Sequence, residues 1–217
     1  VLGLEPEPLG TLETTAETLA FFRKFFARPG TPRCAREVIG VTLDACHCAV
    51  EFEDAAAGLA ALAEADIRLA KIHLSAALQL EPTDGALATL ANFDEPVYLH
   101  QVVMRNADGA LRRVRDLPEA LQWGRGLPRN DRGAEWRVHF HVPLHAEPVP
   151  PLAGTRENLA GIFDYLARHP DGGVHLEMET YTWAVLPEPL RAGRVEEQIA
   201  AEYHWTLAEL RKRKLAP

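Results

Sequence analysis

Four short apolar runs in the sequence each end in side chains that bind metal ions in proteins. The runs are 1–7, 41–47, 69–73 and 174–179, and each ends in carboxylates or imidazoles. A buried parallel strand is typically a continuous apolar run, and its C-terminal end is where α/β barrels place their sites. Four such ends, separated by helical stretches, predict a metal site at the top of a (β/α) barrel.

The candidate metal ligands combine oxygen and nitrogen donors. In chain order they are Glu5, Asp44, His47, His73, His139, His141 and Glu179. Mixed carboxylate and imidazole ligands favour Zn, Mn, Fe or Co, whereas sites for harder ions are built from oxygen. Buried carboxylates on neighbouring strands cannot all stay ionised without a cation. The expected cofactor is therefore a divalent metal from this group.

Spacing suggests how some of these ligands meet. Asp44 leaves the last position of a strand and His47 sits on the following turn, so both can face one ion. The alternative is an aspartate that caps the next helix and a histidine on a loop. His139 and His141 alternate along an extended segment, which puts two imidazoles on one face.

Two pairs of glutamates are candidates for acid–base chemistry. Glu5 is followed by Glu7, and Glu177 by Glu179; the spacing does not decide which of Glu177 and Glu179 is the ligand. Lys71 lies on the same side of its strand as His73. We take Glu5, Glu177, Glu179 and Lys71 as candidate catalytic residues. Two carboxylates beside a metal-bound sugar can move a proton between adjacent carbons, and a metal hydroxide can instead attack a phosphoester.

The elements that would position these residues alternate between strand and helix. Strands are expected at 1–5, 38–44, 67–74 and 174–179, and helices at 11–27, 54–65, 156–168 and 195–214. Residues 79–135 break the rhythm and are expected to be an insertion. Within it, the turn Asn106–Gly109 predicts a hairpin that joins strands at 97–104 and 111–114.

The composition argues against several classes of protein. The chain has 217 residues and a formal net charge of −8, so DNA or RNA is not an expected partner. The three cysteines, Cys34, Cys46 and Cys48, do not pair evenly, which favours a reducing compartment. The sequence shows neither a signal peptide nor an apolar run that could cross a membrane. We expect a cytoplasmic protein that binds a small metabolite, with no membrane insertion; the oligomeric state is not indicated.

The first residue, Val1, already lies in an expected strand. Four strand–helix units make half of an eight-stranded barrel, and four parallel strands leave two open edges. Either the partner strands lie outside residues 1–217 or the fold is not a closed barrel. We expect the first, so that residues 1–217 are a single domain that forms the C-terminal part of a longer protein.

The motifs resemble strands five to eight of the xylose isomerase-like TIM barrels. This superfamily includes sugar isomerases and epimerases and the endonuclease IV group. The resemblance implies a (β/α)8 barrel in which Glu5, Asp44, His73 and one of Glu177 and Glu179 hold the metal. It further implies that the first and last glutamates shuttle a proton. His47 and the His139–His141 pair resemble the additional ligands of the multinuclear zinc site in the endonuclease IV group.

Longer stretches are similar to the metabolite traffic protein EboE family. They are 43–54, 71–78, 139–144 and 179–187. This likeness implies a TIM-barrel fold, a metal site and a role in secondary-metabolite processing or traffic, while the chemistry of the family is poorly defined. The order Glu5, Asp44, His73 and Glu177 or Glu179 makes a metal-dependent sugar isomerase- or epimerase-like protein the leading hypothesis. Two alternatives remain, an endonuclease IV-like multinuclear zinc phosphoesterase and a non-catalytic metabolite-binding protein. If the metal-site hypothesis is right, His47 and His141 should lie in the same cluster as the ligands, whereas His169 and His204, on helical segments, should not.

Overall fold

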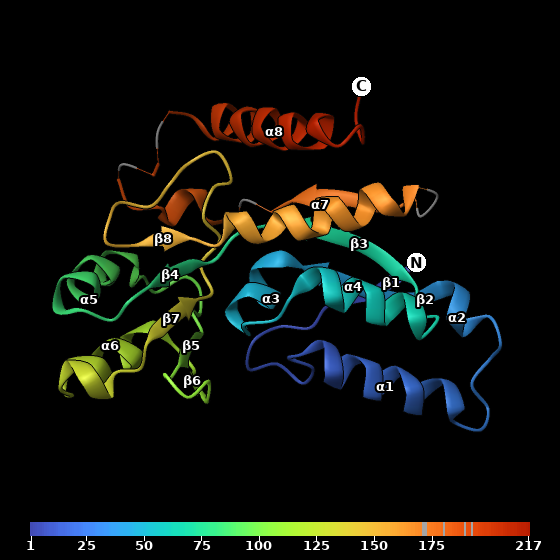
Figure 1. Cartoon of the computed structure of the whole chain (residues 1–217), viewed down its shortest axis with the longest axis horizontal. Coiled ribbons are helices and arrows are strands. Elements are labelled where there is room, and N and C mark those ends of the chain that lie inside the picture. The colour runs from blue at the N-terminus through green and yellow to red at the C-terminus, as the bar shows by residue number, and fades with distance from the viewer. Residues whose placement is uncertain (171–172, 180, 189, 192) are drawn as a thin grey trace. The chain divides into compact units, whose positions relative to one another are not determined.

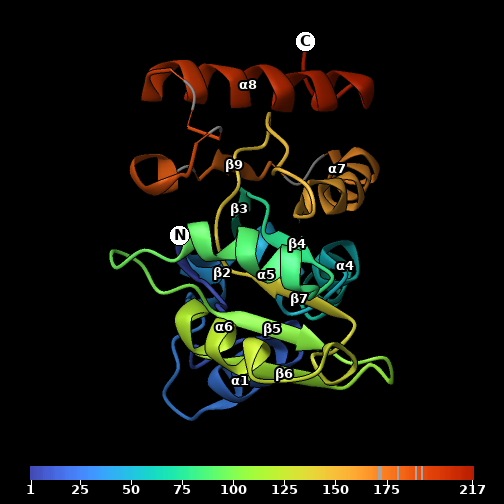
Figure 2. The ribbon, with the colours of Figure 1, turned by 90° about the vertical axis from the view of Figure 1, so that its left-hand side faces the viewer.

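The computed structural model describes residues 1–170, 173–179, 181–188, 190–191 and 193–217. The chain divides into two compact units, each built from separated stretches of sequence. The first unit comprises 1–74, 158–179 and 207–217, and the second comprises 75–157 and 180–206. The class is mixed α/β, since one sheet is parallel and the other is antiparallel. Figures 1 and 2 show the elements coloured along the chain.

The first unit contains a parallel sheet of four strands. Its strands are β1 (Leu2–Leu4), β2 (Ile39–Asp44), β3 (Leu69–Leu74) and β9 (His175–Met178), paired in that order. All four strands expected from the apolar runs are therefore confirmed. In the described part of the chain this sheet has two edge strands, β1 and β9, and is open rather than closed into a barrel.

The two faces of this sheet differ in chemistry because side chains alternate along each strand. On β3, Ile72 and Leu74 are buried on one face, while Lys71 and His73 point to the other. Neighbouring strands follow the same alternation, since His73 is the register partner of Asp44 on β2. The sheet therefore has an apolar face for helix packing and a polar face that leads to the strand ends.

Among the described residues, the α-helices that belong wholly to the first unit are α1 (Thr15–Ala27), α2 (Ala35–Val38), α3 (Ala45–Val50), α4 (Ala55–Glu64) and α7 (Leu159–Arg168). Helix α4 packs beside α1 and α7, as Figure 1 shows. The expected start of α1 at Thr11 is wrong. The helix begins later because Thr14 and Glu17 form a reciprocal capping box, which satisfies the first free N–H groups.

The second unit contains an antiparallel sheet of order β6-β5-β7-β4-β8. Its strands are β4 (Leu78–Leu80), β5 (Val102–Arg105), β6 (Leu111–Val114), β7 (Glu135–Val138) and β8 (Ala153–Gly154). The predicted hairpin is confirmed, because β5 and β6 pair across the Asn106–Gly109 turn. The expected start of its first strand at residue 97 is wrong, since β5 begins at Val102. The expected extended segment at 138–142 contributes only Val138 to a strand.

Helices α5 (Asp84–Leu90) and α6 (Leu117–Arg125) belong to the second unit, with short 3-10 turns η1 (Ala91–Phe93), η2 (Arg129–Asp131) and η5 (Tyr181–Val185). A further turn, η3 (Arg156–Asn158), leads into α7. The core of this unit is built around Trp136 and Phe140, which are fully buried. The Trp136 indole N–H donates to the Arg132 carbonyl over 2.7 Å, so burial leaves its polar atom satisfied.

The chain ends in α8 (Val195–Lys212), close to the predicted 195–214. Among the described residues, no helix has the length and apolar character needed to cross a membrane.

Two helix glycines provide opposite tests of the packing. A Cβ added at Gly124 in α6 would lie 2.6 Å from the buried Trp136 ring, whereas one at Gly161 in α7 would meet Ala56 at an ordinary 3.4 Å. Alanine gains about 0.5–1 kcal/mol over glycine inside a helix, and overpacking costs about 1–3 kcal/mol. We expect Gly161→Ala to raise the free energy of unfolding and Gly124→Ala to lower it, as measured by urea denaturation. The packing described here is contradicted if both variants are stabilised.

Candidate metal centre

Four side chains from four adjacent strand ends converge in the first unit. Glu5 follows β1, Asp44 is the last residue of β2, His73 lies near the end of β3, and Glu179 follows β9. One ligand atom from each side chain lies within 4.8 Å of one from every other. The parallel register explains this meeting, because the C-terminal ends of parallel strands share one edge of a sheet.

The δ1 nitrogen of His73 is the centre of this cluster. It lies 2.9 Å from Glu5 Oε1, 3.2 Å from Glu179 Oε2 and 3.3 Å from Asp44 Oδ2. One imidazole N–H cannot donate fully to three carboxylates. The arrangement therefore places three anionic oxygens around a point that requires a cation.

The pKa of His73 reflects the need for a positive charge among these three carboxylates. Burial of the His73 ring lowers its pKa, but hydrogen bonds to Asp44, Glu179 and Glu5 outweigh burial and raise the pKa to about 11. A protonated His73 supplies one positive charge against three carboxylates. The donor set of three carboxylates and one imidazole thus fits a divalent ion of the Zn, Mn, Fe or Co type, which would replace that proton.

Asp44 has two roles, one for each carboxylate oxygen. Its Oδ1 accepts a hydrogen bond of 2.9 Å from the His47 amide and so caps α3, while Oδ2 faces His73. The capping role and the ligand role that the spacing left as alternatives are therefore compatible. A buried carboxylate held by a helix N-terminus has a fixed orientation, so Oδ2 is already placed to act as a metal ligand.

His47 lies at the margin of the cluster. Its Nδ1 is 2.8 Å from the Pro6 carbonyl and 3.8 Å from Glu5 Oε1. Because a carbonyl only accepts, Nδ1 is the donor in this contact. His47 is therefore a buried histidine held by a backbone carbonyl, and its distance from Glu5 is longer than a hydrogen bond.

The two glutamates of the cluster are accessible, whereas the other two ligands are not. The side chains of Glu5 and Glu179 are 32% and 34% exposed, while those of Asp44 and His73 are 0% and 5% exposed. Asp44 and His73 can therefore act as anchors, and Glu5 and Glu179 can also reach a substrate.

Glu177 occupies a different position from Glu179. Its Oε2 accepts a 2.9 Å hydrogen bond from Lys71 Nζ and lies 3.9 Å from Nε2 of His73, on the other side of the ring. The bond to Lys71 lowers the pKa of Glu177 and raises that of Lys71. Of the two glutamates, Glu179 is thus the one that joins the four-residue cluster, a choice that strand alternation alone cannot make because both point to one face.

His139 and His141 belong to the second unit and form a pair of their own. Both rings are buried, and their Nε2 atoms are 3.3 Å apart. Gln101, which the sequence did not suggest as a site residue, places its side-chain oxygen 2.7 Å from His139 Nδ1. That contact leaves the His139 Nε2 lone pair facing His141. The expectation that His141 joins His47, a residue of the other unit, stays a prediction.

Aromatic rings continue from this imidazole pair within the second unit. The Tyr181 ring lies 4.8 Å from His141, and the Tyr98 ring lies 4.8 Å from Tyr181. Thr182 donates a 2.7 Å hydrogen bond to the His141 carbonyl, so the segment after β9 fixes the histidine backbone. Each histidine of the pair is therefore held by a contact of its own, His139 through its ring and His141 through its backbone.

His169 lies outside the four-residue cluster, as expected. It is the C-terminal cap residue of α7, where its ring stacks on Tyr165 at 4.2 Å and its Nδ1 contacts the Tyr165 carbonyl. His204 is exposed on α8. Both are ordinary surface histidines of helices.

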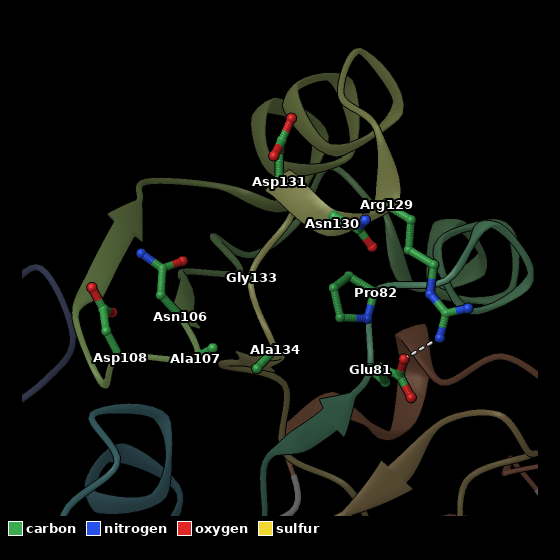
Figure 3. Close-up of a pocket in the computed structure, with 10 residues that line it drawn as sticks. All are labelled: Glu81, Pro82, Asn106, Ala107, Asp108, Arg129, Asn130, Asp131, Gly133 and Ala134. Carbon is green, nitrogen blue, oxygen red and sulfur yellow. Dashed lines mark hydrogen bonds and ion pairs between the residues drawn. The ribbon is translucent and has the colours of Figure 1, made fainter.

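A large open cleft of about 710 Å³ lies in the second unit, away from every predicted site residue of that unit. Figure 3 shows it between the Asn106–Asp108 turn and the 129–134 loop, with the ion pair of Arg129 and Glu81 at one side. Its polar side chains are exposed and do not converge on one point. The cleft therefore lacks the arrangement that distinguishes the His73 cluster.

Comparison with known proteins adds no relative. No protein-family model, no curated protein and no solved structure matches this chain. The chemical interpretation therefore depends on the geometry of the side chains.

Proposed function

We propose that the first unit binds one divalent metal ion through Glu5, Asp44, His73 and Glu179, and that the protein is a metal-dependent sugar isomerase- or epimerase-like protein. The observation that carries this proposal is the convergence of four ligand atoms, from four successive strand ends, within 4.8 Å. A bound metal would polarise a carbonyl or hydroxyl of a polyhydroxylated substrate.

In this proposal the chain itself handles the proton. Glu5 and Glu179 lie on opposite edge positions of the site, after β1 and β9, and both are partly exposed. One would remove a proton from a substrate carbon and the other would return it to the adjacent position or opposite face. Glu177 is engaged by Lys71, so proton transfer is assigned to the other two glutamates.

The fold and the cellular context form part of the same proposal. The sequential order of four parallel strands, each ending in a ligand, supports a (β/α)8 barrel of xylose isomerase-like type. The likeness of residues 43–54 and 71–78 to the EboE family supports a role in secondary-metabolite processing or traffic, in the cytoplasm and on a small metabolite.

A second candidate function is a multinuclear zinc phosphoesterase of endonuclease IV type. The observation that favours it is the buried His139–His141 pair, whose Nε2 atoms face each other at 3.3 Å. An epimerase with one metal ion has no need of this pair. The excess of acidic residues, with a formal net charge of −8, argues against DNA as the substrate of either candidate.

Metal stoichiometry tests both candidates. Protein dialysed against Zn²⁺, Mn²⁺ or Co²⁺ and then freed of excess metal should retain one ion per chain, as measured by plasma mass spectrometry. Two or three zinc ions would favour the phosphoesterase. Less than a tenth of an ion per chain with every metal, together with an unchanged melting temperature, would contradict both.

A further inference from the structure

We infer that Glu177, held by Lys71, is a positioning residue that accepts the Nε2–H of His73 and thereby directs the Nδ1 of that ring to the metal. This inference rests on the proposed metal site and assigns a role to two residues outside its ligand set. The basis is that Nδ1 of His73 faces Glu5, Asp44 and Glu179, whereas Nε2 faces Glu177.

The orientation of the His73 ring decides which of its nitrogens would bind the ion. All three carboxylates of the cluster approach Nδ1, at distances of 2.9–3.3 Å. The nitrogen that would bind the ion is therefore Nδ1. A metal-binding histidine has one hydrogen left, and with Nδ1 coordinated that hydrogen is on Nε2.

The other ring nitrogen of His73, Nε2, lies in a different environment. This atom is buried and makes no hydrogen bond to any described residue. A buried donor without an acceptor is costly, so a partner is expected nearby. Glu177 is the cross-strand partner of His73, and its Oε2 lies 3.9 Å from Nε2. That distance is longer than a hydrogen bond, and a small change in the Glu177 side-chain torsions closes it.

Lys71 keeps the Glu177 carboxylate in place. Lys71 precedes His73 by two positions on the same face of β3, and its Nζ donates to Glu177 Oε2 over 2.9 Å. Lys71 thus holds the carboxylate beside the ring, and a carboxylate–histidine–metal arrangement results. Loss of such a partner typically weakens metal binding by about 10–100-fold.

Metal affinity of substituted full-length chains tests the inference. We expect Glu177→Ala and Lys71→Met each to raise the Kd for Co²⁺ by about 10–100-fold in competition with a chelator. Lys71→Arg keeps the ion pair and should restore most of the affinity. His169→Ala is the matched control, since His169 is an exposed histidine of the same unit that caps α7 and lies outside the four-residue cluster. Its Kd should stay within about twofold of the wild type.

The coordination geometry provides a second readout that a loss of stability would not produce. The visible absorption of bound Co²⁺ should keep its shape in Glu177→Ala, because the ligand set is unchanged. In the Zn²⁺-loaded wild type, nitrogen-15 NMR should show His73 protonated at Nε2. Metal bound at Nε2, a changed Co²⁺ spectrum in Glu177→Ala, or wild-type affinity in that variant would each overturn the inference. Those results leave the metal site intact, whereas a wild type that binds no metal defeats the proposed function itself.

Discussion

Replacing Asp44 with asparagine should abolish high-affinity metal binding while α3 stays folded. Asparagine keeps an oxygen that can accept from the His47 amide, as Oδ1 does now over 2.9 Å. It replaces Oδ2, which lies 3.3 Å from His73 Nδ1, by an NH2 group that cannot coordinate a cation. Because losing a ligand costs more than the about 10–100-fold loss caused by an outer partner, we expect at least about a 100-fold rise in Kd for Zn²⁺ or Co²⁺. Calorimetric titration or chelator competition measures it.

Asp54→Asn is the control for this experiment. Asp54 also caps a helix of the first unit, accepting from the amides of Ala56 and Ala57 at the start of α4, but it is no part of the cluster. Its substitution should leave the metal Kd within about twofold of the wild type. Equal metal binding by Asp44→Asn and Asp54→Asn would show that Asp44 is a helix cap alone.

The second large effect is on the pH dependence of stability in the metal-free protein. The pKa of His73 is 6.5 when unperturbed and about 11 in the fold. Since the folded value is the higher one, the stabilisation is fully present below pH 6.5 and is lost as pH rises toward 11. One proton corresponds to about 1.4 kcal/mol per pH unit within that window. We expect the free energy of unfolding to fall between pH 7 and 8.5.

Urea denaturation with a chelator at pH 7, 7.5, 8 and 8.5 measures this slope. Burial raises the pKa of the Cys48 thiol, so the ionisation of this thiol in the unfolded chain would also lower the stability at higher pH. The range of pH stops at 8.5 to limit that contribution. His73→Gln provides the comparison, because it removes the titrating group and should flatten the curve. An equal slope in wild type and His73→Gln would contradict the charge arrangement of the cluster.

The strand ends could be read from the sequence because burial and chemistry coincide there. Each apolar run ends in polar residues where the chain leaves the core. The side chains at these strand ends, such as Asp44 and His73, lie together because the parallel register places them side by side at one edge of the sheet. The choice between Glu177 and Glu179 could not be read, since both have the same parity. It depends on Lys71, which reaches across to Glu177 from the neighbouring strand.

The second sheet was harder to predict because its strands are too short to show a period. Leu78–Leu80 and Ala153–Gly154 span three and two residues, and pairing depends on contacts distant in sequence. Gln101 was missed for a similar reason. Its side chain is identified as a partner of His139 only once β5 lies beside β7.

The most direct test of the metal centre is a crystal structure of the protein grown with Mn²⁺ or Zn²⁺ and measured at the absorption edge of that metal. We expect an anomalous difference peak about 2.0–2.2 Å from a carboxylate oxygen of each of Glu5, Asp44 and Glu179 and from Nδ1 of His73. A saturating metal concentration that produces no peak within this cluster, with the four side chains still converging, would contradict the account.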